Sequence, residues 1–439
     1  MGHLVGKDLF RKLGEKIDGL EMRAPWNEKL YAILKELYSP EEADVVIKMP
    51  YGLSTLEGLE KVTGYRRVEL QRILDSLTAK GLVTDLCIHD TYRYVPSPFV
   101  VGVFEFTMMR MGPDARPKEW AKLLHDYMDR DFHAANLGKG ERFSTFRALP
   151  HDGTIASSEH AEILDHEKVS ALLAGAEKFS IGLCSCRHEK QHLGTKKCDV
   201  PLETCSAFGL AADFLIRNKL AREVTRSEME ENFARSRAKG LVLIADNVRA
   251  NMKFVCHCCS CCCNLLETIN EYGYPNIVVT SSYVAEIDAK GCSGCELCVE
   301  TCPIHAISIE PAAGARPGGN GGATPPPKVD AALCLGCGVC ALQCTTGACA
   351  LKKRGQRVIH PETTFERLML QCLEKGTLQN QIFDDPGRID QKFMRAFVGA
   401  FLRLPAVKQA LLSDRMRSRF LDSMRSGVRK QGKGWALEI

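Results

Sequence analysis

A doubled cysteine run constrains this chain more than any other feature of its sequence. Each copy reads C-x2-C-x2-C-x3-C, a spacing typical of [4Fe–4S] ligation. Three thiolates from one tight loop can bind three corners of a cuboidal cluster, while the following turn carries the fourth cysteine away to a neighbouring cluster. Two clusters with crossed ligands are therefore predicted, and their ligand sets are Cys292, Cys295, Cys298 and Cys344 for one, and Cys334, Cys337, Cys340 and Cys302 for the other.

This run resembles the two-cluster bacterial ferredoxin domain. The residues that follow the copies, Pro303-Ile-His-Ala-Ile and Thr345-Thr-Gly-Ala, fit the resemblance. The chain departs from the family at Thr345, where the family usually has proline, and in a long insert between the copies, but neither departure removes a ligand. C-x2-C pairs also make structural zinc sites, but the doubled spacing favours iron–sulfur clusters. The resemblance implies single-electron transfer.

Cysteine content also indicates the redox environment. Of the 21 cysteines in 439 residues, all but Cys87 fall between Cys184 and Cys372. Such a density occurs in secreted proteins with disulfides, but this spacing favours thiolates held reduced around metal. No apolar stretch resembles a signal peptide or a membrane span, so we expect a cytoplasmic protein in an anaerobic setting. The net charge of +4 indicates no particular partner.

Ten further cysteines lie upstream of the doubled run. Neighbouring side chains diverge on a helix and alternate on a strand, so these ten thiols cannot all bind one centre. We predict at least one additional iron–sulfur cluster here; two clusters, a zinc site or buried free thiols are the alternatives. His257 is expected to form a hydrogen bond rather than to bind metal, and Arg187 either offsets cluster charge or is solvated. The ten candidates are Cys184, Cys186, Cys198, Cys205, Cys256, Cys258, Cys259, Cys261, Cys262 and Cys263.

The first hundred residues resemble a winged helix-turn-helix domain. A capping box at Ser54 begins a helix that should end near Gly64, a second amphipathic helix includes Val68, and a hairpin turns around Asp90. The resemblance implies a recognition helix on DNA, or else the same fold used for packing or docking. The residues that would face the groove are Tyr65, Arg66, Arg67 and Arg72, but Glu69 and Asp75 offset the positive charge of the arginines, which favours a packing or docking role.

The central segment is expected to form an α/β domain with its cysteines in loops at the ends of elements. We predict strands before Cys184 and before Cys256, and helices at 205–218 and 227–237. A stretch rich in Gly and Pro, 311–328, is predicted to be a flexible loop between the two ferredoxin halves.

The C-terminal segment is predicted to be helical and basic. Residues 352–439 contain 18 Lys and Arg against 9 Asp and Glu, a net charge of +9. An apolar stripe at helical spacing is expected to be core, although it could instead lie on a membrane surface or an acidic partner. Its members are Phe393, Met394, Phe397, Val398, Phe401 and Leu402.

Together these features predict an α+β multidomain protein. The expected parts are a winged-helix-like module (1–100), an α/β domain with cysteine-rich loops (101–283), a ferredoxin-like dicluster domain (284–352) and a helical tail (353–439). The combination resembles a family of multidomain iron–sulfur proteins from anaerobic bacteria. We expect an electron carrier for an oxidoreductase partner. The alternatives are a reductase with a substrate at the upstream cysteines and a redox-responsive DNA-binding regulator.

Overall fold

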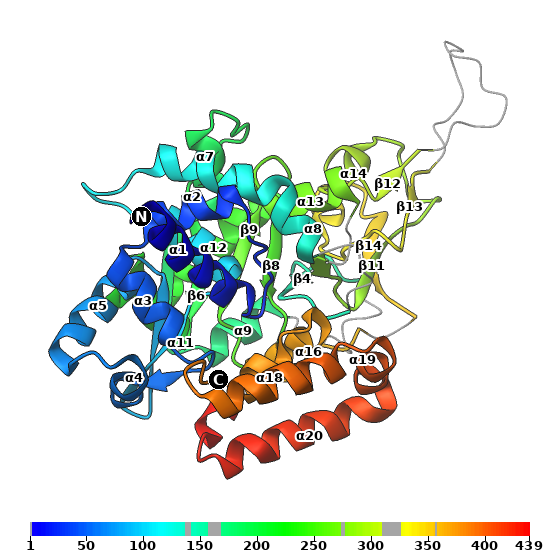
Figure 1. The fold of residues 1–439 in the computed structure, drawn as a ribbon. Coiled ribbons are helices and arrows are strands. Elements are labelled where there is room, and N and C mark those ends of the chain that lie inside the picture. The colour runs from blue at the N-terminus through cyan, green and yellow to red at the C-terminus, as the bar shows by residue number, and fades with distance from the viewer. Residues whose placement is uncertain (1, 137–141, 157–167, 274–276, 310–325, 356–357) are drawn as a thin grey trace.

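The structure is a computed structural model that describes residues 2–136, 142–156, 168–273, 277–309, 326–355 and 358–439. It combines helices with small sheets, as expected for the α+β class. The N-terminal helices lie on one side of a seven-stranded sheet, the segment with the doubled cysteine run lies on the other, and the C-terminal helices run along one end (Figure 1). Most of the expected loop at 311–328 lies outside the described residues.

The first hundred residues form a helical layer with a three-stranded sheet in the order β1-β3-β2. One predicted detail is wrong: Thr55, not Ser54, caps α4 by accepting a hydrogen bond from the Gly58 N–H at 3.2 Å. The helix ends at Gly64, which adopts a left-handed conformation, as predicted. The elements are α1 (Gly2–Asp18), α2 (Glu28–Leu37), α3 (Pro40–Lys48), β1 (Ser54–Thr55), α4 (Leu56–Thr63), α5 (Arg67–Ala79), β2 (Val83–Ile88) and β3 (Thr91–Pro96).

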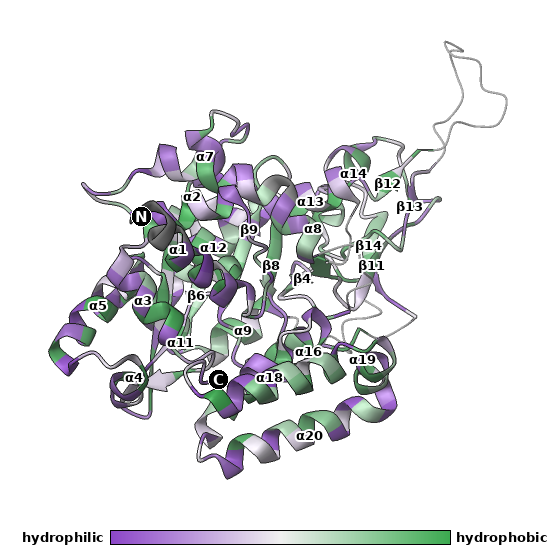
Figure 2. Ribbon diagram, in the orientation of Figure 1, coloured by the Kyte–Doolittle hydropathy of each residue, from purple (hydrophilic) through white to green (hydrophobic). Residues whose placement is uncertain are grey.

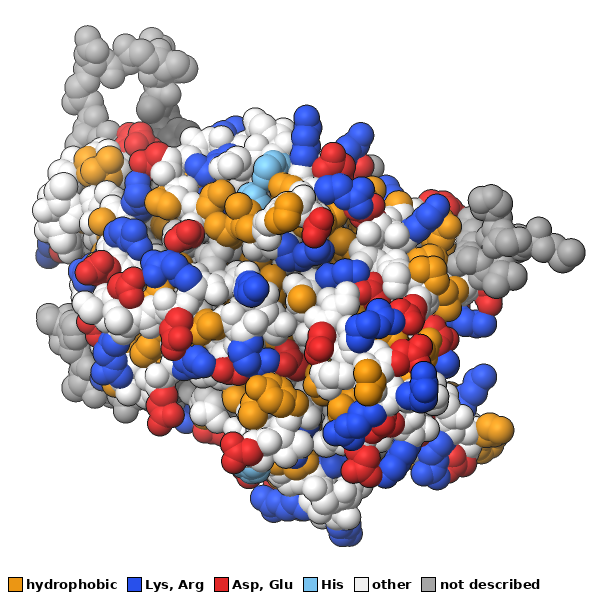
Figure 3. All heavy atoms as spheres, turned by 90° about the vertical axis from the view of Figure 1, so that its left-hand side faces the viewer, with side chains coloured by type: hydrophobic (Ala, Val, Ile, Leu, Met, Phe, Trp, Pro, Cys, Tyr) orange, Lys and Arg blue, Asp and Glu red, His pale blue; other side chains and the backbone are white. Residues whose placement is uncertain are grey.

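The helix α5 packs with Leu70, Ile73, Leu74 and Leu77 buried, but Val68 is 85% exposed and does not belong to its apolar face. Basic residues near its start are paired with acids: Arg67 with Glu60 at 3.1 Å and Arg72 with Glu41 at 2.7 Å. On the face of the molecule shown in Figure 3, basic and acidic side chains are interspersed. This charge pattern does not favour a nucleic-acid surface.

The β2–β3 hairpin packs against the middle of the chain rather than projecting into solvent. Leu86 and Ile88 of β2 share an apolar cluster with Phe214 of α11 (Gly209–Arg217). Arg217 of that helix binds the Asp85 carboxylate at 2.5 Å. The hairpin is thus part of the packing between segments.

The seven-stranded sheet has the order β10-β4-β8-β9-β6-β5-β7, and every neighbouring pair is antiparallel except β10 with β4. The interior strand β8, third in this order, is buried throughout, and Figure 2 shows it as hydrophobic. The strands are β4 (Phe146–Leu149), β5 (Phe179–Leu183), β6 (Glu203–Phe208), β7 (Ala221–Val224), β8 (Val242–Asp246), β9 (Phe254–Cys258) and β10 (Val278–Val279).

The predicted helix at 205–218 is wrong in its first turn. Cys205 lies in strand β6, which pairs with β5 and β9, and helix α11 begins only at Gly209. Hydrogen bonding on both strand edges overrides the local helical pattern. The predicted helix at 227–237 is confirmed as α12 (Arg226–Ala238).

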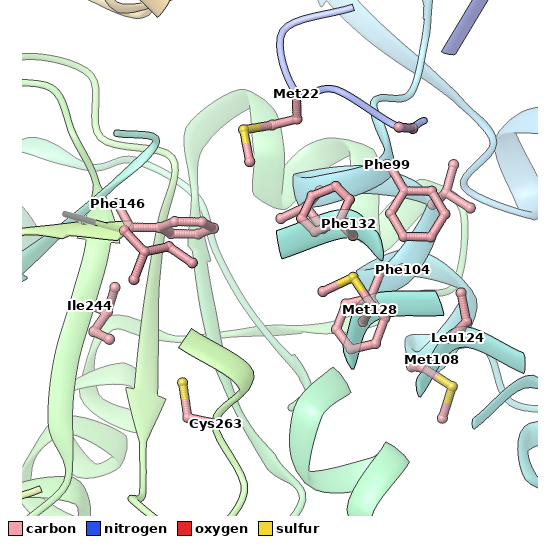
Figure 4. Close-up of a cluster of buried hydrophobic side chains, with 14 of the residues drawn as sticks. Met22, Phe99, Phe104, Met108, Leu124, Met128, Phe132, Phe146, Ile244 and Cys263 are labelled. Atoms are coloured by element: carbon pink, nitrogen blue, oxygen red, sulfur yellow. The ribbon is translucent and has the colours of Figure 1, made fainter. Parts of the chain in front are cut away.

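Helices cover the sheet on the side of the N-terminal segment. Figure 4 shows Phe99, Phe104 and Phe132 of this layer packed together, with Phe146 and Ile244 of the sheet opposite and Cys263 nearby. The remaining central elements are η1 (Phe99–Val103), α6 (Phe104–Met109), α7 (Pro117–Tyr127), η2 (Met128–Phe132), α8 (His133–Asn136), α9 (Val169–Gly175), α10 (Ser185–His192) and α13 (Asn264–Tyr272).

The doubled cysteine run forms two short antiparallel sheets, β11 with β14 and β12 with β13. Leu351 of β14 also exchanges backbone hydrogen bonds with Thr154 and Ala156, at 2.8 and 2.9 Å, so residues after β4 extend this sheet. The elements are β11 (Tyr283–Ile287), α14 (Leu297–Glu300), β12 (Ile307–Ser308), β13 (Lys328–Val329), α15 (Val339–Leu342) and β14 (Cys349–Lys353).

The C-terminal segment is helical, as predicted, but its apolar stripe is not core. On α18, Phe393, Phe397 and Phe401 are 69%, 67% and 55% exposed, and only the flank with Leu402 is buried. No described helix is long and apolar enough to cross a membrane. The elements are α16 (Thr364–Lys375), α17 (Leu378–Ile382), α18 (Ile389–Leu402), α19 (Pro405–Leu412), α20 (Asp414–Lys430) and η6 (Gly434–Leu437).

Candidate metal centres

The doubled run encloses two cavities, and each is lined by four of its cysteines. Three cysteines lining each cavity come from one copy and the fourth comes from the other copy. The two sets match the crossed grouping inferred from spacing. One cavity is lined by Cys292, Cys295, Cys298 and Cys344, and the other by Cys334, Cys337, Cys340 and Cys302. Cys349, which follows the second copy, also lines the first cavity.

The two cavities differ in their exposure. Cys295 of the first set is exposed, and the other three members are partly exposed, so we call this the outer cavity. All four cysteines of the second set are buried, with exposed fractions of 7–8%, so we call this the inner cavity. A group bound in the outer cavity would face solvent, and one bound in the inner cavity would be enclosed by protein.

Backbone N–H groups point at the two cysteines that cross between the copies. The Ala306 N–H donates to Cys302 Sγ at 3.2 Å, and the Cys349 N–H donates to Cys344 Sγ at 3.3 Å. Burial alone would raise the pKa of Cys344, but hydrogen bonds from Cys349 and Thr346 outweigh it and lower the pKa. These bonds stabilise thiolates, the form that binds metal.

The loop that carries Cys334, Cys337 and Cys340 is held in place by a close contact with the backbone at Tyr283 and by one arginine. Gly336 adopts a φ of +67°, and a Cβ there would collide with the Tyr283 carbonyl oxygen, so only glycine fits. Arg354 donates to the Tyr283 oxygen at 2.9 Å, to the Ala331 oxygen at 2.8 Å, and to the Cys334 oxygen. The role of Arg354 was not predicted from the sequence, although the residue directly follows strand β14.

The ten upstream cysteines divide into two groups. In the first group the four Sγ atoms all lie within 4.8 Å of one another. One of its members lies in the loop after α10 and the others lie in the turn that follows β9. We call these four the four-thiol group: Cys198, Cys259, Cys261 and Cys262.

The other six, the six-thiol group, come from several elements that meet at one end of the sheet. Its members are Cys184 and Cys186 at the start of α10, Cys205 on β6, Cys256 and Cys258 on β9, and Cys263 before α13. Side chains alternate along a strand, so Cys256 and Cys258 share one face of β9 while His257 takes the other.

Electrostatic coupling shows how closely the six-thiol group is packed. Hydrogen bonds from the thiols of Cys205 and Cys258 hold the pKa of Cys256 well below its usual value. The pKa of Cys263 is also well lowered, first by Cys186 and then by Cys258, with added N–H donors at the start of α13. The pKa values of the other four thiols are raised, so two of the six, Cys256 and Cys263, are stabilised as thiolates, the form that binds metal.

Two helices begin at this group. Cys184 occupies the N-cap position of α10 and Cys263 that of α13, so the positive ends of both helix dipoles are close to the thiolates. The two helices are tied to each other by side chains: Asn264 donates to Glu189 at 2.8 Å, and Lys190 pairs with Glu267 at 2.8 Å.

Arg187 is fully buried between the two upstream groups. It donates to the Thr204 hydroxyl at 2.7 Å, to the Pro201 oxygen at 2.9 Å, and to the His257 oxygen. Burial would lower the pKa of its guanidinium, but Cys184 and Cys259 outweigh this and raise the pKa, so Arg187 stays charged. Of the two interpretations of Arg187 drawn from the sequence, the structure supports the one in which it offsets the negative charge of thiolates.

The histidines form hydrogen bonds. His257 bonds the Ser206 hydroxyl at 2.8 Å, and burial lowers its pKa to about 3, so its ring is neutral at physiological pH. Glu105 was not predicted from the sequence; it is a half-buried carboxyl near Cys205 and Cys256, and desolvation raises its pKa to about 8.

The inner cavity and the six-thiol group are connected through packed residues. The His151 N–H donates to the Cys337 oxygen at 3.1 Å, and its ring bonds the Leu241 oxygen at 2.7 Å. The next residue, Val242, pairs with Cys258 across β8 and β9. Burial lowers the pKa of His151, so this link carries no charge at neutral pH.

Comparison with known proteins supports the interpretation of the doubled run. Residues 291–348 match the family model of the 4Fe-4S dicluster domain. No curated protein and no solved structure matches the chain. The chain therefore contains a ferredoxin-type segment that supports [4Fe–4S] binding, and its four-thiol group could hold a further metal ion.

Proposed function

We propose that this protein carries single electrons between a redox partner and a further iron–sulfur centre at the six-thiol group. Two [4Fe–4S] clusters, with the crossed ligand sets described above, would occupy the outer and inner cavities and exchange single electrons when bound. The difference in exposure between the two cavities carries this proposal. The protein contributes ligands, burial, N–H donors and a packed connection, and needs no acid, base or nucleophile of its own.

The outer cavity is the proposed docking face for a redox partner protein. Cys295 is exposed there, Glu296 lines the same cavity and is exposed, and Glu300 is a further exposed acid in the same segment. Because like charges repel and opposite charges steer association, we expect a partner with a basic patch and a rate that falls as salt rises.

The inner cavity faces the centre of the molecule. Its loop contacts His151 and, through Leu241 and Val242, lies one strand pairing from Cys258. A second link joins the two parts, because Asn270 of α13 donates to the Pro303 oxygen at 3.0 Å, next to Cys302. Short, packed contacts of this kind exclude water from the path between the two sites. A cluster bound in the inner cavity, rather than one in the outer cavity, would therefore exchange electrons with the six-thiol group.

Iron and acid-labile sulfide per chain, with EPR of the reduced form, test this proposal on protein purified without oxygen. The full chain should contain about eight irons in the dicluster segment and about four or more at the six-thiol group. Cys302→Ala and Cys344→Ala should each remove about four irons, the first from the inner cavity and the second from the outer.

Cys349→Ala is the matched control, since Cys349 is a buried cysteine that lines the outer cavity but belongs to neither predicted ligand set. Its iron content should equal that of the unmodified chain. If Cys302→Ala and Cys344→Ala lose the same EPR signal, the crossed ligand sets are wrong. If the unmodified chain holds only about eight irons, the six-thiol group is no iron–sulfur centre.

A further inference from the structure

The four-thiol group has the dimensions of a site for one metal ion. In a tetrahedral thiolate site with metal–sulfur bonds of about 2.3 Å, neighbouring sulfurs are separated by about 3.8 Å. Here Cys198 Sγ lies 3.6 Å from Cys259 Sγ and 3.9 Å from Cys262 Sγ. Cys261 Sγ lies 3.8 Å from Cys259 Sγ and 3.5 Å from Cys262 Sγ.

An iron–sulfur cube does not fit these distances. In a cuboidal cluster each cysteine binds a different iron, so the four sulfurs surround the whole cluster and stand farther apart than the edge of a single-ion tetrahedron. The four-thiol group is too tight for that arrangement, whereas the cavities of the doubled run enclose space between their cysteines.

We propose that Cys198, Cys259, Cys261 and Cys262 bind one Zn²⁺ ion in a mononuclear site that is separate from every iron–sulfur centre of the chain. The proposal goes beyond the electron-carrier function and does not depend on it. Four thiolates satisfy the tetrahedral preference of zinc and leave no position for water or substrate, so the site is structural.

The ion would fasten two segments that are distant in sequence. Cys198 lies in the loop between α10 and β6, and the other three lie in the turn between β9 and α13. Hydrogen bonds already hold the two ends of this loop, from the Thr195 N–H to the Lys190 oxygen at 2.9 Å and from the Cys184 N–H to the Leu202 oxygen at 2.7 Å. Members of the six-thiol group lie on or directly before β6, β9, α10 and α13. Joining the two segments through zinc would therefore also hold these elements in place around the six-thiol group.

Arg187 supports a negatively charged site here. A Zn²⁺ ion with four thiolates carries two net negative charges, and a buried charge needs a partner. The Arg187 guanidinium interacts with Cys259 of the four-thiol group as well as with Cys184 of the six-thiol group. The buried Arg187 side chain therefore offsets negative charge at both the four-thiol group and the six-thiol group.

Zinc and iron analysis of the full chain tests the proposal. Unmodified protein should contain about one zinc ion per chain, with four sulfur neighbours at about 2.3 Å and no nearby iron in the zinc X-ray absorption spectrum. Cys198→Ser should lower zinc at least tenfold and leave iron and sulfide unchanged. Cys184→Ser, in the six-thiol group, is the matched variant and should keep its zinc.

Three results would overturn the proposal. The first is less than half a zinc ion per chain in the unmodified protein, and the second is a lone iron with four sulfur neighbours in its place. The third is loss of iron and sulfide together in Cys198→Ser. If Cys198→Ser fails to fold, the absorption spectrum of the unmodified chain decides. Because zinc and iron are counted separately, failure here leaves the electron-carrier proposal standing, and the reverse also holds.

Discussion

Replacing Arg187 by methionine should separate two roles of one buried cation. Methionine is unbranched and of similar length, so the change removes the charge and the hydrogen bonds with little loss of volume. Three acceptors lose their donor: the Thr204 hydroxyl and the carbonyl oxygens of Pro201 and His257. Arg187→Lys is the matched control, because it keeps the charge but cannot reach all three acceptors.

Loss of the hydrogen bonds should destabilise the fold. Removing one side of a buried charged interaction costs about 3–5 kcal/mol. With an unfolding entropy of about 2.1 cal/mol/K per residue, 439 residues give about 0.9 kcal/mol/K, so the Tm should fall by about 3–5 °C. Arg187→Lys loses some of the hydrogen bonds but keeps the charge, so its Tm should fall by less.

Loss of the charge should lower the reduction potential of a centre bound at the six-thiol group. A unit charge about 4 Å from a thiolate contributes about 4 kcal/mol at an effective dielectric constant of 20. Since cluster charge is spread over many atoms, we expect about half of this, or about 85 mV for one electron. The sign follows because reduction adds negative charge, which Arg187 stabilises.

A redox titration followed by EPR, on protein purified without oxygen, measures the potential. The upstream signal should shift to lower potential in Arg187→Met and stay near its original value in Arg187→Lys. An unchanged or raised potential in Arg187→Met would refute the electrostatic reasoning. Equal shifts in both variants would assign the effect to altered packing instead.

Three further expectations concern other parts of the chain. The exposed stripe on α18, within the basic C-terminal segment, should bind anionic vesicles. Phe393→Asp with Phe397→Asp should weaken co-sedimentation at least about tenfold without changing the circular dichroism, and equal binding to uncharged vesicles would contradict the expectation. Burial lowers the pKa of Lys253 to about 8, so between pH 8 and 10.5 the unfolded chain binds more protons and stability should rise with pH. Denaturant titrations should show this rise, up to about 1.4 kcal/mol per pH unit, and lose it in Lys253→Met. Gly338→Ala should lower the free energy of unfolding, measured in urea, by about 2–4 kcal/mol, because the residue has a φ of +83° and the added Cβ would collide with the Thr154 side chain. Gly347→Ala, at a φ of +71° with open space around it, should lower it by only about 1 kcal/mol.

Short-range signals in the sequence predicted much of the fold. The hairpin around Asp90 and the helix that ends at Gly64 follow from turn and capping residues alone, and both are present. The hairpin and the helix depend only on neighbouring residues. The crossed ligand sets, Cys344 with the first copy and Cys302 with the second, stay a prediction from spacing, and the linings of the two cavities are consistent with them.

The division of the upstream cysteines needed the three-dimensional structure. In sequence, Cys256 to Cys263 is one dense run, but β9 ends at Cys258 and the chain then turns. Cys259, Cys261 and Cys262 consequently meet Cys198, while Cys256, Cys258 and Cys263 meet cysteines from β6 and α10. No local pattern shows which distant loop reaches the turn.

For the apolar stripe on α18, the sequence predicted the apolar face of the helix but not its exposure. The spacing of Phe393, Phe397 and Phe401 showed correctly that one face of the helix is apolar. Helical periodicity does not show what covers such a face, and in the described residues these three rings remain exposed.

The burial of the inner cavity has a consequence for how the protein matures. A factor that delivers a preformed cluster must reach four thiols at once, and in the folded chain Cys302 and its three companions are covered. The outer set, with Cys295 exposed, stays within reach after folding. If a cluster occupies the inner cavity, it must therefore be inserted before the chain packs around these four cysteines, whereas the outer set can be loaded later.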